Sequence, residues 1–161
     1  MRFPCFLLAV GLSFSSVQAA IVRPAPEFFW RGIGGSSISL SETARQPVVL
    51  IIAPSARSGA FKKQLGEIET LYRQYAGRGT LFCAAFTEKQ TNVRTNIPFL
   101  YVQDATAIAA QYGQGRRGFR IAIIGPDRNL DLISSEVLNA EQLRDVIDNS
   151  FAQQSVRRAG Q

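Results

Sequence analysis

The sequence contains no histidine among its 161 residues. Histidine is the side chain that most often acts as a general base near neutral pH, and its imidazole is a common metal ligand. Its absence excludes Ser-His-Asp and Cys-His catalytic arrangements, so we expect no metal site. No cofactor is expected either, because the glycines of residues 32–35 lack the strand-to-helix setting of a phosphate-binding or dinucleotide-binding loop.

The chain also has no apolar run that would comfortably span a bilayer, which takes about 20 residues. Residues 3–14 form a shorter apolar run after a positively charged start, and Val17 and Ala19 then satisfy the small-x-small rule of a cleavage site. This order predicts a signal peptide cut after Ala19 and a protein that is exported, either periplasmic or secreted. An uncleaved N-terminal anchor is the alternative. No second segment of that length follows, so the cleaved chain is expected to be soluble, without a transmembrane segment.

Cysteine is scarce, with only two in the sequence. Cleavage removes Cys5 and leaves Cys83, which then has no partner for an internal disulfide. Cys83 stands in an apolar run, whereas a reactive thiol needs an electropositive and partly exposed position. We therefore interpret Cys83 as a small hydrophobic residue of the core.

Basic residues outnumber acidic ones, with 18 Lys and Arg against 12 Asp and Glu and a net charge of +6. Loss of Arg2 with the signal peptide leaves 17 against 12, a net charge of +5. The positive charges are mostly arginine and are scattered along the chain up to the pair at residues 157–158. This pattern favours a solvated basic surface, and we expect no nucleic-acid binding.

Residues 48–53 form a continuously apolar run and residues 80–86 and 119–124 form largely apolar ones, and all three predict buried strands of a central sheet. Between the first two, apolar residues recur every three or four positions from residue 59 until Gly77, which predicts an amphipathic helix. The apolar stripe of this helix consists of Phe61, Leu65, Ile68, Leu71, Tyr72 and Tyr75. The segment therefore reads as a strand–helix–strand unit with parallel strands.

Shorter elements surround this unit. The sequence predicts a hairpin over residues 28–40, a short helix over 105–112 and an antiparallel strand over 130–134. A final helix is predicted to begin at Asn139, with Gln142 completing a capping box. The predicted organisation is a signal peptide over residues 1–19, one domain over 26–152 and a frayed basic tail over 153–161.

The order of these elements resembles the thioredoxin-like superfamily. Residues 46–50 are similar to the start of the first core strand in peroxiredoxins and exported thiol-disulfide oxidoreductases. Residues 97–104 resemble the segment before their next helix, and residues 123–128 resemble the turn after a later strand. The resemblance covers roughly residues 26–150. It implies an α/β fold, a thioredoxin-like three-layer sandwich with an N-terminal β-hairpin extension and a central mixed sheet.

Two further segments, residues 54–57 and 118–127, resemble a bacterial thioredoxin-like domain family of unknown function. The enzymes of the superfamily carry a Cys-x-x-Cys pair where this chain has Arg-Ser-Gly-Ala at residues 57–60. They also carry a cis-proline where this chain has Gly118 and Phe119. The resemblance therefore implies the fold without its thiol chemistry.

In a thioredoxin-like fold, the loop before the third core strand lies beside the start of the first helix. The free N–H groups of a helix start attract anions, and neighbouring arginines add to the attraction. The candidate residues for binding an anion or a partner are Ser55, Arg57, Ser58, Gly59, Arg116 and Arg117. The alternative is that these arginines are solvent-exposed loop residues.

These observations predict an exported, redox-inactive domain with a binding or accessory role toward a protein or a small anionic ligand. Two alternatives stay open. One is a single-cysteine thiol peroxidase or oxidoreductase that uses Cys83, and the other is a structural envelope protein attached by its basic surface. No residue is assigned a catalytic role, and whether the chain is an enzyme is left open.

Overall fold

The computed structural model describes residues 23–43, 45–88, 93–113 and 118–150. The predicted signal peptide and the predicted basic tail lie outside these ranges. The strands are β1 (Phe29–Arg31), β2 (Ser37–Ser39), β3 (Val48–Ala53), β4 (Leu81–Phe86), β5 (Leu100–Tyr101), β6 (Arg120–Ile124) and β7 (Leu130–Ser134). The α-helices are α1 (Gly59–Ala76), α2 (Ala105–Gln111) and α3 (Ala140–Asp148). None of the helices in the described ranges has the length and apolar character needed to cross a membrane.

Five strands form a mixed central sheet in the order β5-β4-β3-β6-β7. The pairs β3–β4 and β4–β5 are parallel, whereas β3–β6 and β6–β7 are antiparallel. The predicted strand–helix–strand unit is thus confirmed, because α1 connects the parallel strands β3 and β4. β3 is central and buried at all six positions, as its continuous apolar run predicts.

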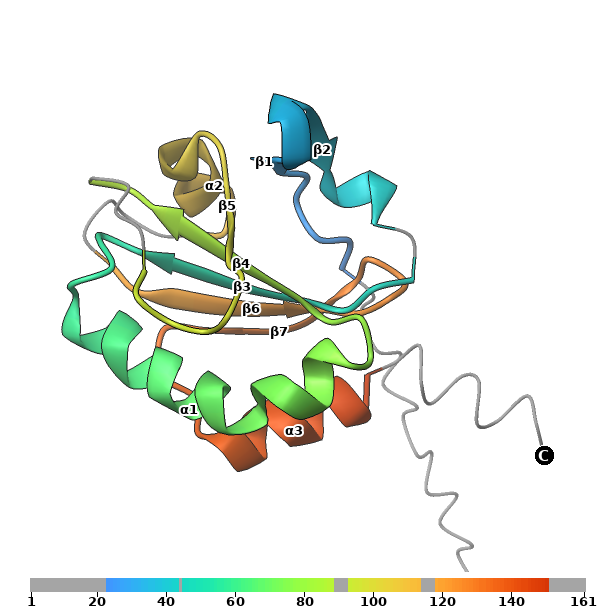
Figure 1. The fold of residues 1–161 in the computed structure, drawn as a ribbon, viewed down its shortest axis with the longest axis vertical. Helices are drawn as coiled ribbons and strands as arrows, with labels where there is room; N and C mark the ends of the chain where they lie inside the picture. The colour runs from blue at the N-terminus through green and yellow to red at the C-terminus, as the bar shows by residue number, and fades with distance from the viewer. Residues whose placement is uncertain (1–22, 44, 89–92, 114–117, 151–161) are drawn as a thin grey trace, which may run out of the picture.

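The sheet separates two layers, which Figure 1 shows from the side. Helices α1 and α3 cover one face, and α2 and the β1–β2 hairpin cover the other. Each face of the sheet has its own hydrophobic core, and alternate residues of β3 contribute to the two. Val49 and Ile51 pack toward α1 and α3, whereas Val48 and Leu50 pack toward α2 and the hairpin. The α/β three-layer sandwich with an N-terminal hairpin is therefore confirmed.

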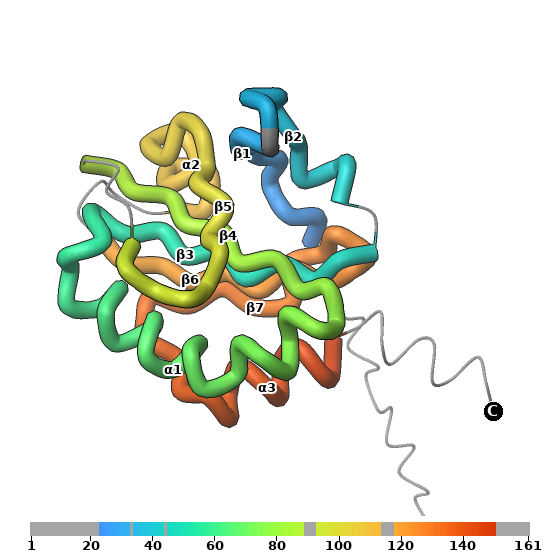
Figure 2. Tube along the Cα trace, in the orientation of Figure 1, coloured from blue at the N-terminus to red at the C-terminus, as the bar shows by residue number. Residues whose placement is uncertain are grey.

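The hairpin attaches to the sheet at its β5 edge. β1 and β2 pair antiparallel, and Trp30 of β1 also forms a bridge with Val102, directly after β5. The Gln103 N–H donates to the Phe29 carbonyl at 2.7 Å, which extends this pairing by one position. In the trace of Figure 2, the hairpin lies on the same side of the sheet as α2.

Helix α1 shows where the sequence pattern was incomplete. Four members of the predicted stripe are buried, but Leu65 and Tyr72 are only half-buried, and Gln64 is completely buried. A polar side chain accepts such a position only when it has hydrogen-bond partners there. The capping box that opens α3 is confirmed, with Asn139 Oδ1 accepting from Gln142 N–H at 2.8 Å.

Candidate functional site

The candidate site is the turn that joins β3 to α1. Its shape depends on Ser55, whose carbonyl accepts from the Ser58 N–H at 3.1 Å and whose Oγ accepts from the Arg57 N–H at 3.3 Å. Ser58 is the N-cap residue of α1, with φ −61° and ψ 142°, and its carbonyl accepts from the N–H of Lys62 at 3.1 Å. The turn thus places Arg57 and Ser58 directly at the start of the helix.

The start of α1 has no side-chain cap. Serine is a favoured N-cap residue because its Oγ accepts from the second or third helical N–H, but Ser58 makes no such bond. Its Oγ is buried and has no hydrogen-bond partner among the described residues. No acidic residue occupies the first turn, and a Cβ at exposed Gly59 would meet no described atom within 4 Å. The helix start therefore offers uncompensated N–H groups and open space.

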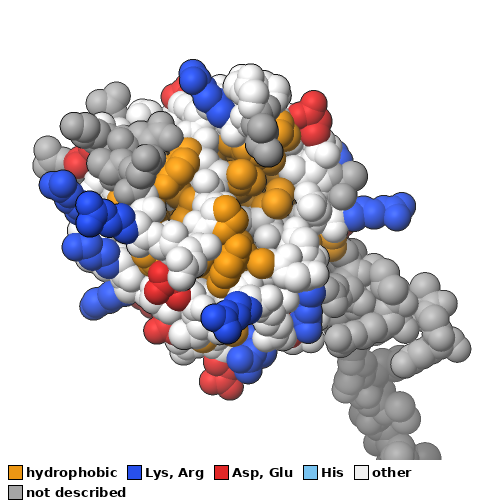
Figure 3. Space-filling model, in the orientation of Figure 1, with side chains coloured by type: hydrophobic (Ala, Val, Ile, Leu, Met, Phe, Trp, Pro, Cys, Tyr) orange, Lys and Arg blue, Asp and Glu red, His pale blue; other side chains and the backbone are white. Residues whose placement is uncertain are grey.

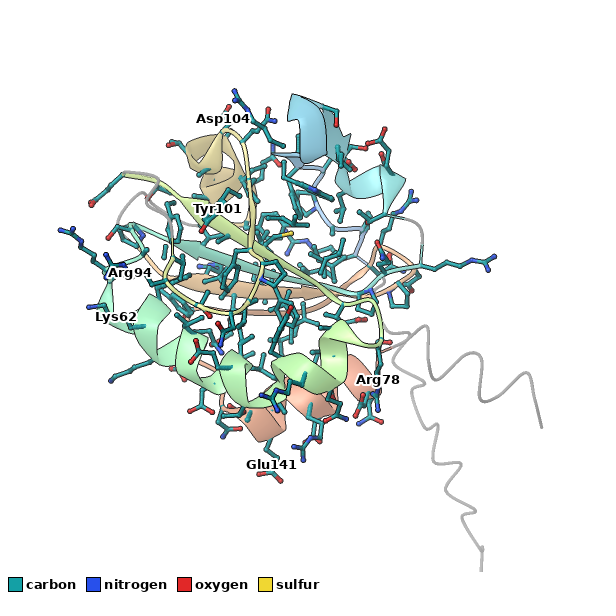
Figure 4. All side chains as sticks on the ribbon, in the orientation of Figure 1. Lys62, Arg78, Arg94, Tyr101, Asp104 and Glu141 are labelled. Atoms are coloured by element: carbon teal, nitrogen blue, oxygen red, sulfur yellow. The ribbon has the colours of Figure 1, made fainter. Side chains whose placement is uncertain are left out.

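Positive side chains surround this end of the molecule. Arg57 and Lys62 are exposed, and Figure 4 shows Lys62 and Arg94 on the same side of the molecule. Figure 3 shows several Lys and Arg side chains gathered there. One acidic residue is also nearby, since the N–H of Glu88 donates to the Pro54 carbonyl at 3.0 Å. The cations outnumber this carboxylate, which favours an anionic ligand.

Comparisons with solved structures support the assignment of this architecture. A thiol:disulfide interchange protein from Bacteroides sp. matches with a TM-score of 0.61 at 14% identity, over 83% of this chain and 91% of that one. Thioredoxin peroxidase I from Plasmodium yoelii matches with a TM-score of 0.63 at 14% identity, over 88% and 95%. A putative thiol:disulfide interchange protein DsbE from Chlorobium tepidum matches with a TM-score of 0.57 at 15% identity, over 84% and 95%. The chain has the thioredoxin-like fold.

At these identities the likeness establishes the fold alone. No protein-family model matches the sequence, and no curated protein matches it. The resemblance to the narrower bacterial family therefore stays a prediction, as does any activity.

Four of the predicted site residues are near neighbours in the sequence and lie in one turn. Ser55, Arg57, Ser58 and Gly59 share the β3–α1 turn. Arg116 and Arg117 lie outside the described residues, so their place beside the turn stays a prediction. No cis peptide bond is found in the described ranges, where Gly118 and Phe119 precede β6.

One residue of this region was missed by the sequence analysis. Arg120 is the first residue of β6 and pairs with Ile52, one position before the end of β3. A Cβ at Gly113 would stand 3.8 Å from Arg120 Nη1, so its side chain reaches the end of α2. Its Nε is buried without a hydrogen-bond partner among the described residues. Arg120 could have been found from the sequence, because it is a charged residue within an otherwise apolar predicted strand.

The described residues offer little for thiol or metal chemistry. The turn and the first helical residues contain no sulfur, and Cys83 lies in the middle of the sheet, paired with Leu50 and Leu100. Cys83 is completely buried, and this burial raises the pKa of its thiol well above the ordinary range. No group of three or more Cys, Asp or Glu side chains within the described ranges is placed to hold a metal ion.

Proposed function

We propose that this protein is an exported thioredoxin-like domain with a binding or accessory role, and that it recognises an anionic group at the start of α1. The observation that carries the proposal is the uncapped helix start at Ser58, next to the exposed cation of Arg57. Helix N–H groups and the aligned peptide dipoles favour negative charge there by about 0.3–1 kcal/mol at an exposed site. The ligand would be a phosphate, a carboxylate or an acidic segment of a protein partner.

The absence of thiol chemistry forms part of this proposal. Thiol exchange needs an accessible thiolate, and residues 57–60 supply no sulfur where the related enzymes carry their cysteines. The single-cysteine alternative would have to use Cys83, whose burial disfavours the thiolate. We expect insulin reduction and peroxide consumption to equal the rates without protein. Turnover that Cys83→Ser abolishes would establish the enzymatic alternative instead.

Export rests on the sequence of residues 1–19. A charged start, a short apolar run and a small-x-small site in this order are typical of a cleaved secretory signal. N-terminal sequencing of the exported protein should begin at Ala20. A membrane-bound product that retains Met1 would contradict cleavage.

Substitution of Ser58 provides a direct test of the anion site. Ser58→Asp places a carboxylate at the N-cap, where it accepts from the helix N–H groups and repels an external anion. Ser58→Asn is the matched control, because it supplies a neutral cap of nearly the same size. Titration of phosphate and small carboxylates should show no binding by Ser58→Asp and intermediate binding by Ser58→Asn. Equal affinity in the wild type and Ser58→Asp would contradict the proposal.

The arginines are tested in the same titration. An Arg57→Ala, Arg116→Ala, Arg117→Ala variant should bind about tenfold more weakly, a ratio that corresponds to about 1.4 kcal/mol. Arg73→Ala is the control, because Arg73 is exposed in the last turn of the same helix, far from its start. Affinity should also fall as salt rises, since exposed charges are screened. The control removes one charge and the triple variant three, so a loss of binding free energy in Arg73→Ala that reaches one third of the loss in the triple variant would show that only overall charge matters.

A further inference from the structure

A cavity lies between the end of β1 and the segment that leads from β5 into α2. Its volume is about 650 Å³, within the range of about 300–1,000 Å³ that is usual for small-molecule sites. It is lined by Arg31, Phe86, Phe99, Leu100, Tyr101, Val102, Gln103, Asp104 and Ala105. None of these residues belongs to the β3–α1 turn, so the cavity and the proposed anion site have no lining residue in common.

Strand register explains how the cavity forms. Trp30 and Val102 bridge each other and both belong to the core on the α2 side of the sheet. Side chains alternate along a strand, so their neighbours Arg31 and Tyr101 point to the opposite face. β1 ends at Arg31 and the chain turns away through Gly34, whose φ is +81°. The backbone therefore diverges from β5 just where it would have covered Tyr101.

Aromatic residues contribute to one wall of the cavity, where Phe86 and Phe99 are only 7% and 8% exposed and Tyr101 is half-buried. The rings of Phe86 and Tyr101 lie 6.2 Å apart between centroids, and Phe61 packs behind the wall, 5.0 Å from Phe86 and 6.0 Å from Phe99. Tyr101 is held by its hydroxyl, which accepts from the N–H of Val93 at 2.9 Å. Figure 3 shows hydrophobic side chains gathered on this face of the molecule. The wall is thus preformed, which lowers the entropic cost of binding.

The polar groups of the cavity carry opposite charges. Arg31 is exposed, and its guanidinium has no ion-pair or hydrogen-bond partner among the described residues. Asp104 begins α2, where its carboxylate accepts from the N–H of Ala107 at 3.3 Å. Figure 4 shows Asp104 beyond Tyr101, toward α2. One unpaired cation and one carboxylate therefore flank the aromatic wall.

We propose that this cavity binds a small amphipathic monocarboxylate. Its apolar or aromatic body lies against the rings of Phe86, Phe99 and Tyr101, and its carboxylate pairs with Arg31. A guanidinium binds a carboxylate through two parallel hydrogen bonds, and offset or edge-on ring contacts add to apolar burial. The Asp104 carboxylate disfavours a second negative charge on the ligand, which selects against dicarboxylates.

The test uses four probes with the full chain: 3-phenylpropionate, its neutral amide, acetate and phenylsuccinate. 3-Phenylpropionate should bind about tenfold more tightly than the amide or acetate, which corresponds to about 1.4 kcal/mol for each missing contact. Arg31→Gln should abolish the preference for the carboxylate over the amide. Arg73→Gln is the control, because it removes the same charge from an exposed position on α1.

A second pair of measurements examines Asp104. Asp104→Asn removes the charge but keeps a residue that caps helices and accepts the observed φ of +47°. Phenylsuccinate should bind the wild type more weakly than 3-phenylpropionate does, and Asp104→Asn should narrow that difference. If the wild type binds phenylsuccinate and 3-phenylpropionate equally, or if Asp104→Asn leaves the difference between their affinities unchanged, the assigned role of Asp104 is overturned.

The test of the cavity proposal can be distinguished from the test of the anion site at the start of α1. Ser58→Asp should leave the binding of 3-phenylpropionate at the cavity unchanged, since the two sites share no residue, and should remove only the binding of its carboxylate at the start of α1. If Ser58→Asp abolishes all binding of 3-phenylpropionate and Arg31→Gln does not, the probe binds at the start of α1, and the cavity proposal is overturned while the anion site stands. No binding of 3-phenylpropionate, or equal binding of acid and amide, would also overturn the cavity proposal.

Discussion

The carboxamide of Gln64 forms two hydrogen bonds with the backbone of Leu138: its Oε1 accepts from the Leu138 N–H at 2.8 Å, and its Nε2 donates to the Leu138 carbonyl at 3.0 Å. Gln64 lies on α1, and Leu138 lies just before α3. Glu67, almost one turn further along α1, accepts from the N–H of Ala140 at 2.9 Å. These bonds hold the start of α3 in register against α1 and satisfy backbone groups that the core would otherwise leave unpaired.

Replacement of Gln64 should therefore destabilise the protein strongly. Gln64→Leu keeps the side-chain volume but leaves the N–H and the carbonyl of Leu138 buried without partners. We expect the free energy of unfolding to fall by about 2–4 kcal/mol, since each unsatisfied buried group costs about 1–3 kcal/mol. Urea denaturation measures this change. Gln74→Leu, on the exposed side of the same helix, should change it by less than about 0.5 kcal/mol.

Cys83 should be unreactive in the folded protein. Its side chain is completely buried and its thiol is held neutral, so a thiol reagent should not modify it until the chain unfolds. The measurement uses a Cys5→Ser background, so that any modification reports on Cys83 alone. We expect no modification in buffer and one modified thiol in denaturant. Rapid modification of the folded protein would support the single-cysteine enzyme.

Stability should decrease at alkaline pH through Tyr75. Burial, followed by the nearby Asp148 carboxylate, raises the pKa of Tyr75 from 10.0 to about 12. The unfolded chain then ionises first, so the stabilising effect is complete below about pH 10 and is lost as the pH rises toward 12. The urea concentration at the midpoint of unfolding should decrease from pH 8 to pH 11, and this decrease should be larger in the wild type than in Tyr75→Phe. Equal pH dependence in the two proteins would contradict this assignment.

The ion pair between Arg78 and Asp148 should contribute little to the free energy of unfolding. Arg78 Nη1 and Asp148 Oδ1 lie 2.7 Å apart, but the Arg78 side chain is 52% exposed and the Asp148 side chain 29%. Exposed ion pairs contribute about 0.2–1 kcal/mol to stability. Asp148→Asn should lower the free energy of unfolding by less than about 1 kcal/mol at low salt, with the difference shrinking at high salt. A larger loss that salt does not change would indicate that Asp148 acts through Tyr75 instead.

Several elements could be predicted because their signals are local. The apolar run at residues 48–53 marks a strand covered on both faces, and the observed β3 has the same bounds. The spacing of Asn139 and Gln142 specifies a capping box, because both bonds form within one helical turn. The turn at Ser55 and Ser58 could be placed in the same way, because it follows directly from the strand before it.

Other features have no local signal. Leu65 fits the helical period better than Gln64, yet Gln64 occupies the buried position because the backbone of Leu138, more than seventy residues away, accepts one hydrogen bond from its carboxamide and donates another to it. Arg31 and Tyr101 meet around one cavity only because β1 pairs with the segment after β5. No periodicity along the chain records such a pairing.

The sequence by itself determined the order of the longer strands and helices, though not the two-residue edge strand β5, and the lack of sulfur and histidine at the candidate site, because these are properties of neighbouring residues and of composition. The burial of Cys83 was predicted from its apolar run, whereas the tertiary structure decided the partner of Gln64 and the cavity beside Arg31. A hydrophobic pattern indicates which face of an element is buried, but it does not say against which distant element that face will pack. That choice depends on the joint packing of all the elements into one dense core.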